Sequence, residues 1–426
     1  MRDHLDRPVL VVTGLGVVTS LGAGKKDNWA KLTQGVSGIH RITRFPVDGL
    51  RTTISGSVDF IDVKPFTATD LSFAMAELAA DEAIRQSGIG APKDFPGPLV
   101  LAAPPVEVEW PQREDVAALA KENGAQEITY DGMMKVARQR PSYHAMFLFA
   151  YVAERMSERF GTKGSPISLS TACASGATAL QTAADALRRG DCEAALVAAS
   201  DGSIHAEALI RFSLLSALST QNEIPEEASK PFSKNRDGFV MAEGGAALVV
   251  ETYAHAKSRG AKILGFLAGC GEQADGFHRT RSNPNGFAII GTMKRALADA
   301  NLQPDDIGYI NAHGTSTPEN DKMEYLASAS VFGERMPNLP ISSNKSMIGH
   351  TLTAAGAVEA VFSLLTLEHQ LLPPTINYRN PDPALPLDVV PNVARSAQIH
   401  AVMSNSFGFG GQNASLIFTR EPVAAK

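Results

Sequence analysis

The stretch PISLSTACASGATALQTAADALRRGDCEAALVAAS, residues 166–200, contains the pattern that decides the fold. Residues 166–170 form a short apolar run, which predicts a buried strand. Residues 174–189 have the alanine-rich periodicity of a helix, and Gly190 follows as a typical C-terminal cap. Residues 194–199 form a second apolar run. Two strands joined by a helix make a βαβ unit, which requires a parallel strand pair and predicts an α/β protein.

The regions on either side of this unit alternate in the same way, and the alternation begins again past the middle of the chain. The first part adds a helix at 69–87 and strands at 8–12, 98–102 and 246–251. The second part has helices at 287–300 and 350–369 and strands at 261–268, 307–311, 341, 401–404 and 414–418, the last two as an antiparallel pair. A series that occurs twice predicts a duplicated fold, with domains at residues 1–252 and 253–426. Gly14-Leu15-Gly16 is not predicted to be a dinucleotide loop, because position 19 is threonine.

The composition limits the class of protein. The chain of 426 residues carries 39 lysines and arginines against 45 aspartates and glutamates, a formal net charge of −6. Such a mildly acidic chain with 44% hydrophobic residues is predicted to fold and to bind no nucleic acid. Three cysteines without regular spacing support neither a disulfide framework nor a zinc ribbon, which favours a cytoplasmic location. The uncharged runs at 164–184 and 396–419 are rich in small and polar residues, so no membrane span is predicted.

Cys173 lies where the strand at 166–170 ends and the helix begins. The N-terminus of a helix offers free N–H groups and partial positive charge, both of which favour the nucleophilic thiolate. The residues next to it are small and leave room for a substrate: Ala172, Ala174, Ser175 and Gly176. A buried cysteine without a chemical role is the alternative from this motif alone. Cys192 and Cys270 have no such context and are expected to be core residues.

Two histidines follow predicted strands in the second part of the chain. His313 comes after the strand at 307–311, in a turn where Thr315 and Thr317 are placed to hydrogen-bond an amide-bearing substrate arm. His350 opens the helix predicted from that residue onward, so the helix dipole disfavours its cationic form and keeps it a neutral donor. A polar turn that caps a helix is the alternative for His313, and a helix-start residue without a role is the alternative for His350.

A glycine-rich segment separates the last two predicted strands, Asn405-Ser406-Phe407-Gly408-Phe409-Gly410-Gly411-Gln412-Asn413. Glycines at this density let backbone N–H groups point at a ligand, and oxyanion holes are built from such donors. An ordinary tight hairpin turn is the alternative explanation of the same residues.

In this order, the motifs resemble those of the β-ketoacyl-[acyl carrier protein] synthases, specifically the elongating type I/II condensing enzymes (synthase II-like) of the thiolase-like superfamily. The resemblance spans nearly the whole chain and rests on five segments: TACASGA (171–177), KPF to RDGFV with a following Glu-Gly (230–244), NAHGTSTPENDKMEY (311–325), SSNKSMIGHTLTAAGAVEA (342–360) and SNSFGFGGQNAS (404–415). The fold that it implies is a duplicated, layered αβαβα sandwich with two similar mixed-sheet halves, usually in a homodimer.

The resemblance also implies a role for each catalytic residue. Cys173 takes an acyl group from a carrier thioester, and the backbone N–H groups of Cys173 and Phe409 hold the oxyanion. His313 and His350 donate hydrogen bonds to the enolate that forms as malonyl carrier protein loses carbon dioxide. Phe409 also resembles the residue that gates the acyl pocket.

Five further residues receive supporting roles from the resemblance. Lys345 organises the charge in the site and is expected to pair with Asp321 or Glu324. Thr315 and Thr317 hold the phosphopantetheine arm of the carrier protein. Neither a metal nor a tightly held cofactor is expected, because the substrates arrive on that arm.

The implied reaction is fatty acid elongation by decarboxylating condensation of an acyl-enzyme with malonyl-[acyl carrier protein]. The main alternative is a specialised condensing enzyme for very-long-chain, signalling or polyketide acyl chains with a dedicated carrier. A non-catalytic chain-length subunit is a weaker alternative, because such subunits lose the nucleophile. A degradative thiolase would need a second cysteine near the C-terminus, and no cysteine follows Cys270.

Two segments depart from the family pattern. Before the helix at 69–87, where relatives often carry a basic run that docks the acidic carrier, only Lys64 is basic. The alternative docking residues are Lys135, Arg138 and Arg140. Residues 102–107 replace the glycine-rich stretch expected where the acyl pocket is shaped, so the sequence does not predict acyl length.

Overall fold

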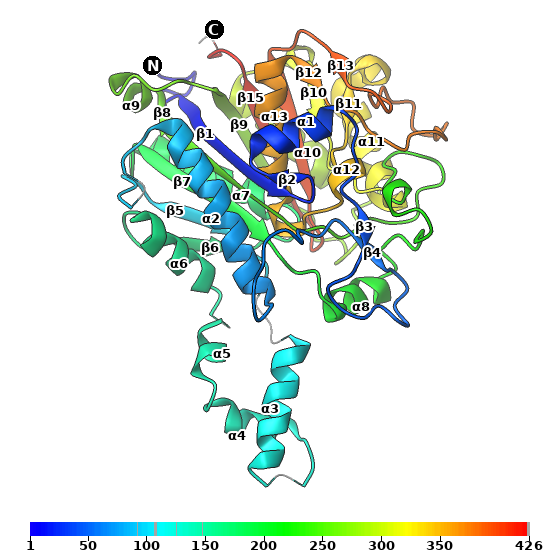
Figure 1. The fold of residues 1–426 in the computed structure, drawn as a ribbon. Coiled ribbons are helices and arrows are strands. Elements are labelled where there is room, and N and C mark those ends of the chain that lie inside the picture. The colour runs from blue at the N-terminus through cyan, green and yellow to red at the C-terminus, as the bar shows by residue number, and fades with distance from the viewer. Residues whose placement is uncertain (92, 106–108, 125, 147, 424–426) are drawn as a thin grey trace.

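One mixed β-sheet of eleven strands runs through the part of the chain that the structure describes (Figure 1). The structure is a computed structural model, and it describes all residues except 92, 106–108, 125, 147 and 424–426. The strands of this sheet are β1 (Leu10–Thr19), β2 (Gly22–Ala23), β5 (Leu99–Ala102), β6 (Ile167–Leu169), β7 (Ala194–Asp201), β8 (Gly244–Thr252), β9 (Gly265–Ala274), β10 (Tyr309–Asn311), β11 (Ile341–Ser342), β14 (Ala401–Phe407) and β15 (Gln412–Thr419).

The order of these strands repeats. From β1 it runs β1-β8-β7-β5-β6, and from β9 it runs β9-β15-β14-β10-β11. In both series the first two pairings are antiparallel and the last two are parallel. The two series, here called the N-terminal and C-terminal half-sheets, meet where β1 pairs with β9 over two residue pairs. The division of the chain into domains at residue 252 stays a prediction.

Apolar side chains alternate between the two faces of each half-sheet, and helices cover both faces. In β7, Val197 belongs to the core around α7 (Ser175–Arg189) and α13 (Ala355–His369), whereas Leu196 belongs to the core around α2 (Ala68–Ser87). In β14, Val402 faces the α13 side and Met403 faces α10 (Phe287–Ala300), which packs on α11 (Pro318–Phe332). The α7–α13 pair therefore lies between the half-sheets. The predicted αβαβα sandwich is confirmed.

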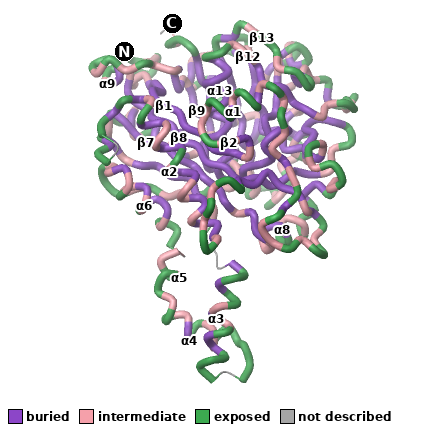
Figure 2. Tube along the Cα trace, viewed as in Figure 1, coloured by how far each residue is buried: buried purple, intermediate pink, exposed green. Residues whose placement is uncertain are grey.

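The two central helices cross at a pair of glycines. A Cβ atom at Gly176 would lie 2.4 Å from the backbone nitrogen of Ala357, and one at Gly356 would lie 2.5 Å from that of Ala177. Both distances are far inside van der Waals contact, so only glycine permits this crossing. All residues of α13 from 355 to 367 are buried (Figure 2), which explains why this helix is apolar on every side. The crossing fixes the two chain segments that precede these helices relative to each other.

Two glycines also explain why the first strand is longer than the sequence predicted. The prediction ended this strand before Gly14, but β1 continues through Gly14 and Gly16 to Thr19. At both glycines an added Cβ would overlap the backbone of α2, at 2.0 Å from the oxygen of Ala83 and 1.9 Å from that of Ala79. These glycines therefore permit close packing of a helix on a strand. Gly269 and Gly271 of β9 play the same part toward α10.

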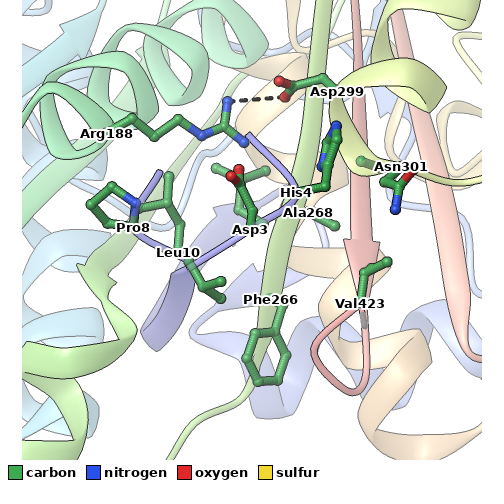
Figure 3. Close-up of a pocket in the computed structure, with 13 residues that line it drawn as sticks. Asp3, His4, Pro8, Leu10, Arg188, Phe266, Ala268, Asp299, Asn301 and Val423 are labelled. Atoms are coloured by element: carbon green, nitrogen blue, oxygen red, sulfur yellow. Dashed lines mark hydrogen bonds and ion pairs between the residues drawn. The ribbon is translucent and has the colours of Figure 1, made fainter. Parts of the chain in front are cut away.

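A cluster of charges ties the N-terminal segment and α7 to α10, and Figure 3 shows the Arg188–Asp299 pair within it. The Asp299 carboxylate, on α10, accepts hydrogen bonds from Arg188 at 2.9 Å and from Arg7 at 2.8 Å. It also accepts the backbone N–H of Cys270 in β9 at 2.8 Å. One carboxylate thus joins elements of both half-sheets at the edge where β1 meets β9.

The segment between β5 and β6 projects from the body as an arm (Figure 1). It contains α3 (Trp110–Glu122), α4 (Tyr130–Ala137) and α5 (Pro141–Met146), which surround a small apolar cluster of their own and are otherwise mostly exposed (Figure 2). α6 (Tyr151–Phe160) then returns the chain to the body. Val106 and Glu107, part of the segment that departs from the family pattern, lie outside the described residues.

The remaining elements cover the ends of the sandwich. They are α1 (Lys25–Thr33), β3 (His40–Arg41), β4 (Ile54–Ser55), α8 (Ala206–Leu214), α9 (Tyr253–Ser258), α12 (Lys345–Ile348), β12 (Leu371–Leu372), β13 (Arg395–Ser396) and four short 3-10 turns, at residues 225–227, 304–306, 333–338 and 352–354. Among the described residues, no helix has the length and hydropathy needed to cross a membrane.

Candidate active site

Cys173 occupies the turn between β6 and α7. The helix starts at Ser175, within one residue of the prediction. Ala172 has a φ of 50°, which an L-residue adopts only under local constraint. The Ser175 hydroxyl supplies that constraint, since it accepts the N–H of Thr171 at 2.7 Å and donates to the carbonyl of Ala172 at 2.6 Å. The turn holds the thiol at a fixed point before the helix.

Burial, and not the helix, decides the protonation state of this thiol. Burial raises the pKa of Cys173 to about 11, although the backbone N–H groups of Phe409 and of Cys173 itself, with the charge of Lys345, lower it. The predicted effect of the helix start is present, since the Cys173 N–H lowers the pKa, but burial outweighs it. The resting group is a thiol, and the two N–H groups that face the sulfur are the pair assigned to the oxyanion hole.

His350 points at the sulfur with a defined tautomer. Its Nε2 lies 3.1 Å from the Sγ of Cys173, and its Nδ1 accepts the backbone N–H of Leu352 at 3.3 Å. An acceptor at Nδ1 leaves the proton of a neutral imidazole on Nε2. Burial, and then the charge of Lys345, lowers the pKa of His350 well below 6.5, so the ring is neutral.

The prediction that His350 opens a long helix was wrong. The chain forms a 3-10 turn at Leu352–Ala354 first, and α13 begins at Ala355. Leu352 has a φ of 49°, which interrupts the helix, and Thr353 is tied to the Asp201 carboxylate through its N–H at 3.1 Å and its hydroxyl at 2.7 Å. The neutrality of the imidazole thus follows from burial beside a lysine, and the helix dipole is not its cause.

His313 follows β10 and faces the same point. Its loop is held by Glu324, whose carboxylate accepts the N–H groups of His313 at 2.9 Å and Gly314 at 2.7 Å. Its ring meets that of His350 edge to face at 5.3 Å. Ligand-type atoms of Cys173, His313 and His350 all lie within 4.8 Å of one another. Burial, then the charges of Lys345 and His350, lowers the pKa of His313 well below 6.5.

Lys345 has a different partner from the one predicted. Its Nζ contacts the Glu359 carboxylate, donates to the His313 carbonyl at 2.6 Å and lies 3.3 Å from the Nδ1 of His313. The predicted partner Asp321 faces Arg236 at 3.4 Å, and Glu324 binds backbone N–H groups. That prediction was wrong, because α13 carries Glu359 to the lysine through the tertiary fold. A carboxylate within an otherwise apolar helix was the sequence signal for it.

The lysine also fixes the tautomer of His313. A lysine ammonium has only donors, so its contact with Nδ1 makes that nitrogen an acceptor and leaves the proton on Nε2. Both neutral imidazoles therefore carry their proton on Nε2, and the His313 ring also hydrogen-bonds the backbone of Phe407, which raises its pKa less than burial lowers it. A divalent metal on the three Cys and His atoms would need to displace both of these protons and the thiol proton, so the donor set as bonded fits hydrogen-bond donation better than metal binding.

The sulfur and both imidazoles line one cavity of about 330 Å³ that opens to the surface. Thr315 and Thr317 line it too, with their hydroxyl oxygens 2.9 Å apart. Phe409 lines the cavity from the turn between β14 and β15. The same turn lies close to Cys173, since a Cβ atom added at Gly408 would lie 3.3 Å from the backbone nitrogen of Cys173. The glycine-rich segment is thus a hairpin turn that also borders the thiol. Asp321 and Glu324 are buried and do not line this cavity.

In fold and in the residues that line its cavity, the protein matches the thiolase-like condensing enzymes whose motifs the sequence resembles. Comparison with known proteins gives the family. The model of the beta-ketoacyl synthase N-terminal domain matches residues 7–256, and that of the beta-ketoacyl synthase C-terminal domain matches residues 264–379. The chain belongs to the beta-ketoacyl synthase family.

The similar proteins match this chain over nearly its full length. A 3-oxoacyl-[acyl-carrier-protein] synthase 2 of Coxiella burnetii is 37% identical over 98% of this chain and 99% of its own. A putative polyketide beta-ketoacyl synthase 1 of Streptomyces cyaneus is 35% identical over 96% of this chain and 97% of its own. Among solved structures, a type II polyketide ketosynthase in complex with its acyl-carrier protein has a TM-score of 0.87 at 32% identity, with 97% of this chain and 100% of that chain covered.

Proposed function

We propose that this protein is an acyltransferase that joins an acyl group to malonyl-[acyl carrier protein], with loss of carbon dioxide, to give a 3-oxoacyl-[acyl carrier protein] two carbons longer. The observation that carries the proposal is the 3.1 Å contact between the Cys173 thiol and the protonated nitrogen of His350, with a second neutral imidazole beside it in one open cavity. The 3-oxoacyl-[acyl-carrier-protein] synthase 2 relatives support the same reaction.

In the first half-reaction the Cys173 sulfur attacks the carbonyl carbon of an acyl thioester. The new S–C bond replaces the bond to the carrier sulfur, and the thiol proton leaves with the carrier as its free thiol. Negative charge on the former carbonyl oxygen is held by the N–H groups of Cys173 and Phe409. Because the thiol has a pKa of about 11, only a small fraction is thiolate near neutral pH, and it is this thiolate that attacks. Covalent capture divides one difficult bond formation into two steps.

In the second half-reaction a malonyl thioester loses carbon dioxide, and the electron pair of the broken C–C bond forms an enolate. The Nε2–H groups of His313 and His350 donate to the enolate oxygen, a task that needs neutral rings. The enolate carbon then attacks the acyl carbon on Cys173 and the C–S bond to the cysteine breaks. The released cysteine sulfur takes a proton from solvent, because the thiol proton left with the first carrier. Lys345 positions His313 through its contact with Nδ1 and touches no reacting atom.

The carrier protein supplies the arm on which both substrates arrive. Thr315 and Thr317 line the cavity wall and are placed to hydrogen-bond the amides of a phosphopantetheine arm. Phe409, partly buried in the lining of the same cavity, gates the route to the acyl chain. We assign the protein to the cytoplasm as a homodimer that needs no metal and no tightly held cofactor.

A polyketide acyl chain with a dedicated carrier is the second candidate. It is favoured by the polyketide synthase relatives at 35% identity and by the polyketide ketosynthase structure. The non-catalytic chain-length role is disfavoured, because Cys173 and both histidines occupy one cavity.

Mass spectrometry of the intact protein tests the nucleophile. Wild-type protein incubated with acyl carriers of several lengths is expected to gain one acyl mass, and Cys173→Ala is expected to gain none. Cys192→Ala is the matched control, because that thiol is partly exposed and lies outside the cavity. Acylation of Cys173→Ala, or normal elongation by it, would refute the assignment.

The same variants separate the two half-reactions. Cys173→Ala is expected to retain decarboxylation of malonyl carrier protein, because both imidazoles remain. His313→Ala is expected to suppress it by about 100-fold or more, the typical loss for one donor to a developing oxyanion. An unchanged decarboxylation rate in His313→Ala would remove this histidine from the mechanism.

A further inference from the structure

Two arginines stand at the mouth of the cavity that contains Cys173. Arg279 and Arg281 both line this cavity and are both exposed, on the loop between β9 and α10. Their positive charges are therefore exposed to solvent at the entrance through which a substrate arm must pass. Neither arginine belongs to the motifs by which the family is recognised in this sequence.

The loop that carries these arginines is fixed to the glycine turn that holds Phe409. The Arg279 carbonyl accepts the N–H of Gly410 at 2.7 Å, and the N–H of Asp275 donates to the carbonyl of Gly411 at 2.7 Å. Within the loop, the Asp275 carboxylate accepts the N–H groups of Phe277 at 3.0 Å and Asn283 at 2.7 Å. The backbone positions of the two arginines are therefore defined relative to the cavity wall.

The three carboxylates that line the same cavity form no ion pair with these arginines among the described residues. Asp275 is bound by backbone N–H groups of its own loop, and Asp237 accepts from Ser219 at 2.7 Å and from the N–H of Thr220 at 3.0 Å. Glu319 is exposed in the first turn of α11, where the helix dipole favours its charge. Neither arginine forms an ion pair with another described residue, so both guanidinium groups are open to an anion from outside.

The basic residues expected from the sequence to dock a carrier protein are placed differently. Lys64 is paired with Asp62 at 2.9 Å, Lys135 with Asp131 at 2.6 Å and Arg140 with Asp115 at 2.7 Å. Lys135, Arg138 and Arg140 belong to the projecting arm, and none of these four basic residues lines the cavity. The positive charge at the entrance is thus supplied by the two arginines.

We propose that Arg279 and Arg281 bind the phosphodiester that joins the substrate arm to the carrier protein. The inference rests on the proposed function, which requires an arm that reaches Cys173 from the surface past Thr315 and Thr317. The outer end of such an arm is a phosphate, and guanidinium groups match phosphate oxygens through paired, charge-assisted N–H donors. The pair replaces the missing basic run as the determinant of carrier recognition.

The test compares three malonyl thioesters in the condensation assay, carried on pantetheine, on phosphopantetheine and on the carrier protein. The double variant R279Q/R281Q is expected to raise KM about tenfold for the two phosphate-bearing substrates, because two exposed charge-assisted contacts are lost. Its KM for malonyl-pantetheine and its kcat for all three substrates are expected to stay unchanged. R420Q is the matched control, an exposed arginine that does not line the cavity.

Each other outcome overturns the proposal in a recognisable way. A rise in KM confined to the carrier-borne substrate would show that the arginines bind carrier side chains and not the phosphodiester. An equal rise for malonyl-pantetheine would show that the substitutions disturb the loop, and no rise at all would remove the arginines from recognition. Failure of the proposed function is distinct, because the wild-type protein would then condense none of the three substrates.

Discussion

Replacing Lys345 by methionine separates what this lysine does for stability from what it does for chemistry. Lys345 and Glu359 are each 1% exposed, and their contact is a buried ion pair. Methionine keeps most of the aliphatic volume but removes the charge and all three contacts of the ammonium group. The second oxygen of Glu359 already has no hydrogen-bond partner among the described residues. In Lys345→Met the buried carboxylate therefore also loses the positive charge that offsets the cost of its burial.

The expected loss of stability in Lys345→Met follows from the buried, unpaired charge of Glu359. Removing one partner of a buried pair costs about 3–5 kcal/mol of the free energy of unfolding, whereas replacing both partners by neutral groups is often close to neutral. Burial raises the pKa of Glu359 to about 7 even with the lysine present. Without the lysine this pKa rises further, so the folded state favours the protonated form while the unfolded state ionises near 4.5. Both folded proteins hold a proton on Glu359 below about pH 7, so the stability deficit is expected to be level there and to grow from about pH 7 upward.

Two measurements on Lys345→Met and on the double variant Lys345→Met/Glu359→Gln separate the stability role of the lysine from its positioning role. Denaturant unfolding at pH 8 is expected to show the full loss in the single variant and recovery of most of it in the double variant. Decarboxylation of malonyl carrier protein is expected to fall about 100-fold in both, because His313 has lost the donor that fixes its tautomer. A single variant as stable as wild type would refute the stability argument. Recovery of decarboxylation in the double variant would refute the positioning role.

Two further predictions concern protonation. The alkylation rate of Cys173 by iodoacetamide is expected to rise about tenfold per pH unit between pH 7 and 9. Only the thiolate reacts, and the thiol has a pKa of about 11. A plateau of the rate near pH 7 would instead show a resting thiolate. The decarboxylation rate of Cys173→Ala is expected to stay level from pH 8 down to 6.5. The pKa values of His313 and His350 lie well below 6.5, so both rings remain neutral donors over this range. A decline of the rate centred near pH 6.5 would contradict the assignment of neutral rings.

The sequence predicted elements well where the boundary is set locally. The helix at Phe287–Ala300 has the predicted bounds, since Gly286 and Asn301, on either side of it, both adopt left-handed backbone. The first strand was predicted too short, because Gly14 ends strands in most contexts and only the approach of α2 explains a glycine within this one. The start of α13 was missed for a similar reason, as Asp201 on a distant strand holds the turn before it.

The reactive residues of the site were predictable, but their partners were not. The motifs around Cys173, His313 and His350 identify groups that the structure brings within 4.8 Å of one another. The partner of Lys345 depends on which helix passes beside it, and proximity in sequence suggested Asp321 or Glu324 in place of Glu359. The protonation state of the thiol also needed the structure, because burial and the helix terminus act in opposite directions.

The glycine pair at the crossing of α7 and α13 shows that the geometry of the site depends on residues outside it. Gly176 and Gly356 have no side chain and take no part in any reaction, yet the separation of the two helices depends on both of them. The spacing between sulfur and imidazole is therefore encoded in positions that lack functional groups altogether. A survey of chemically active residues alone overlooks the two places where one added methyl group would move the nucleophile away from its proton donor.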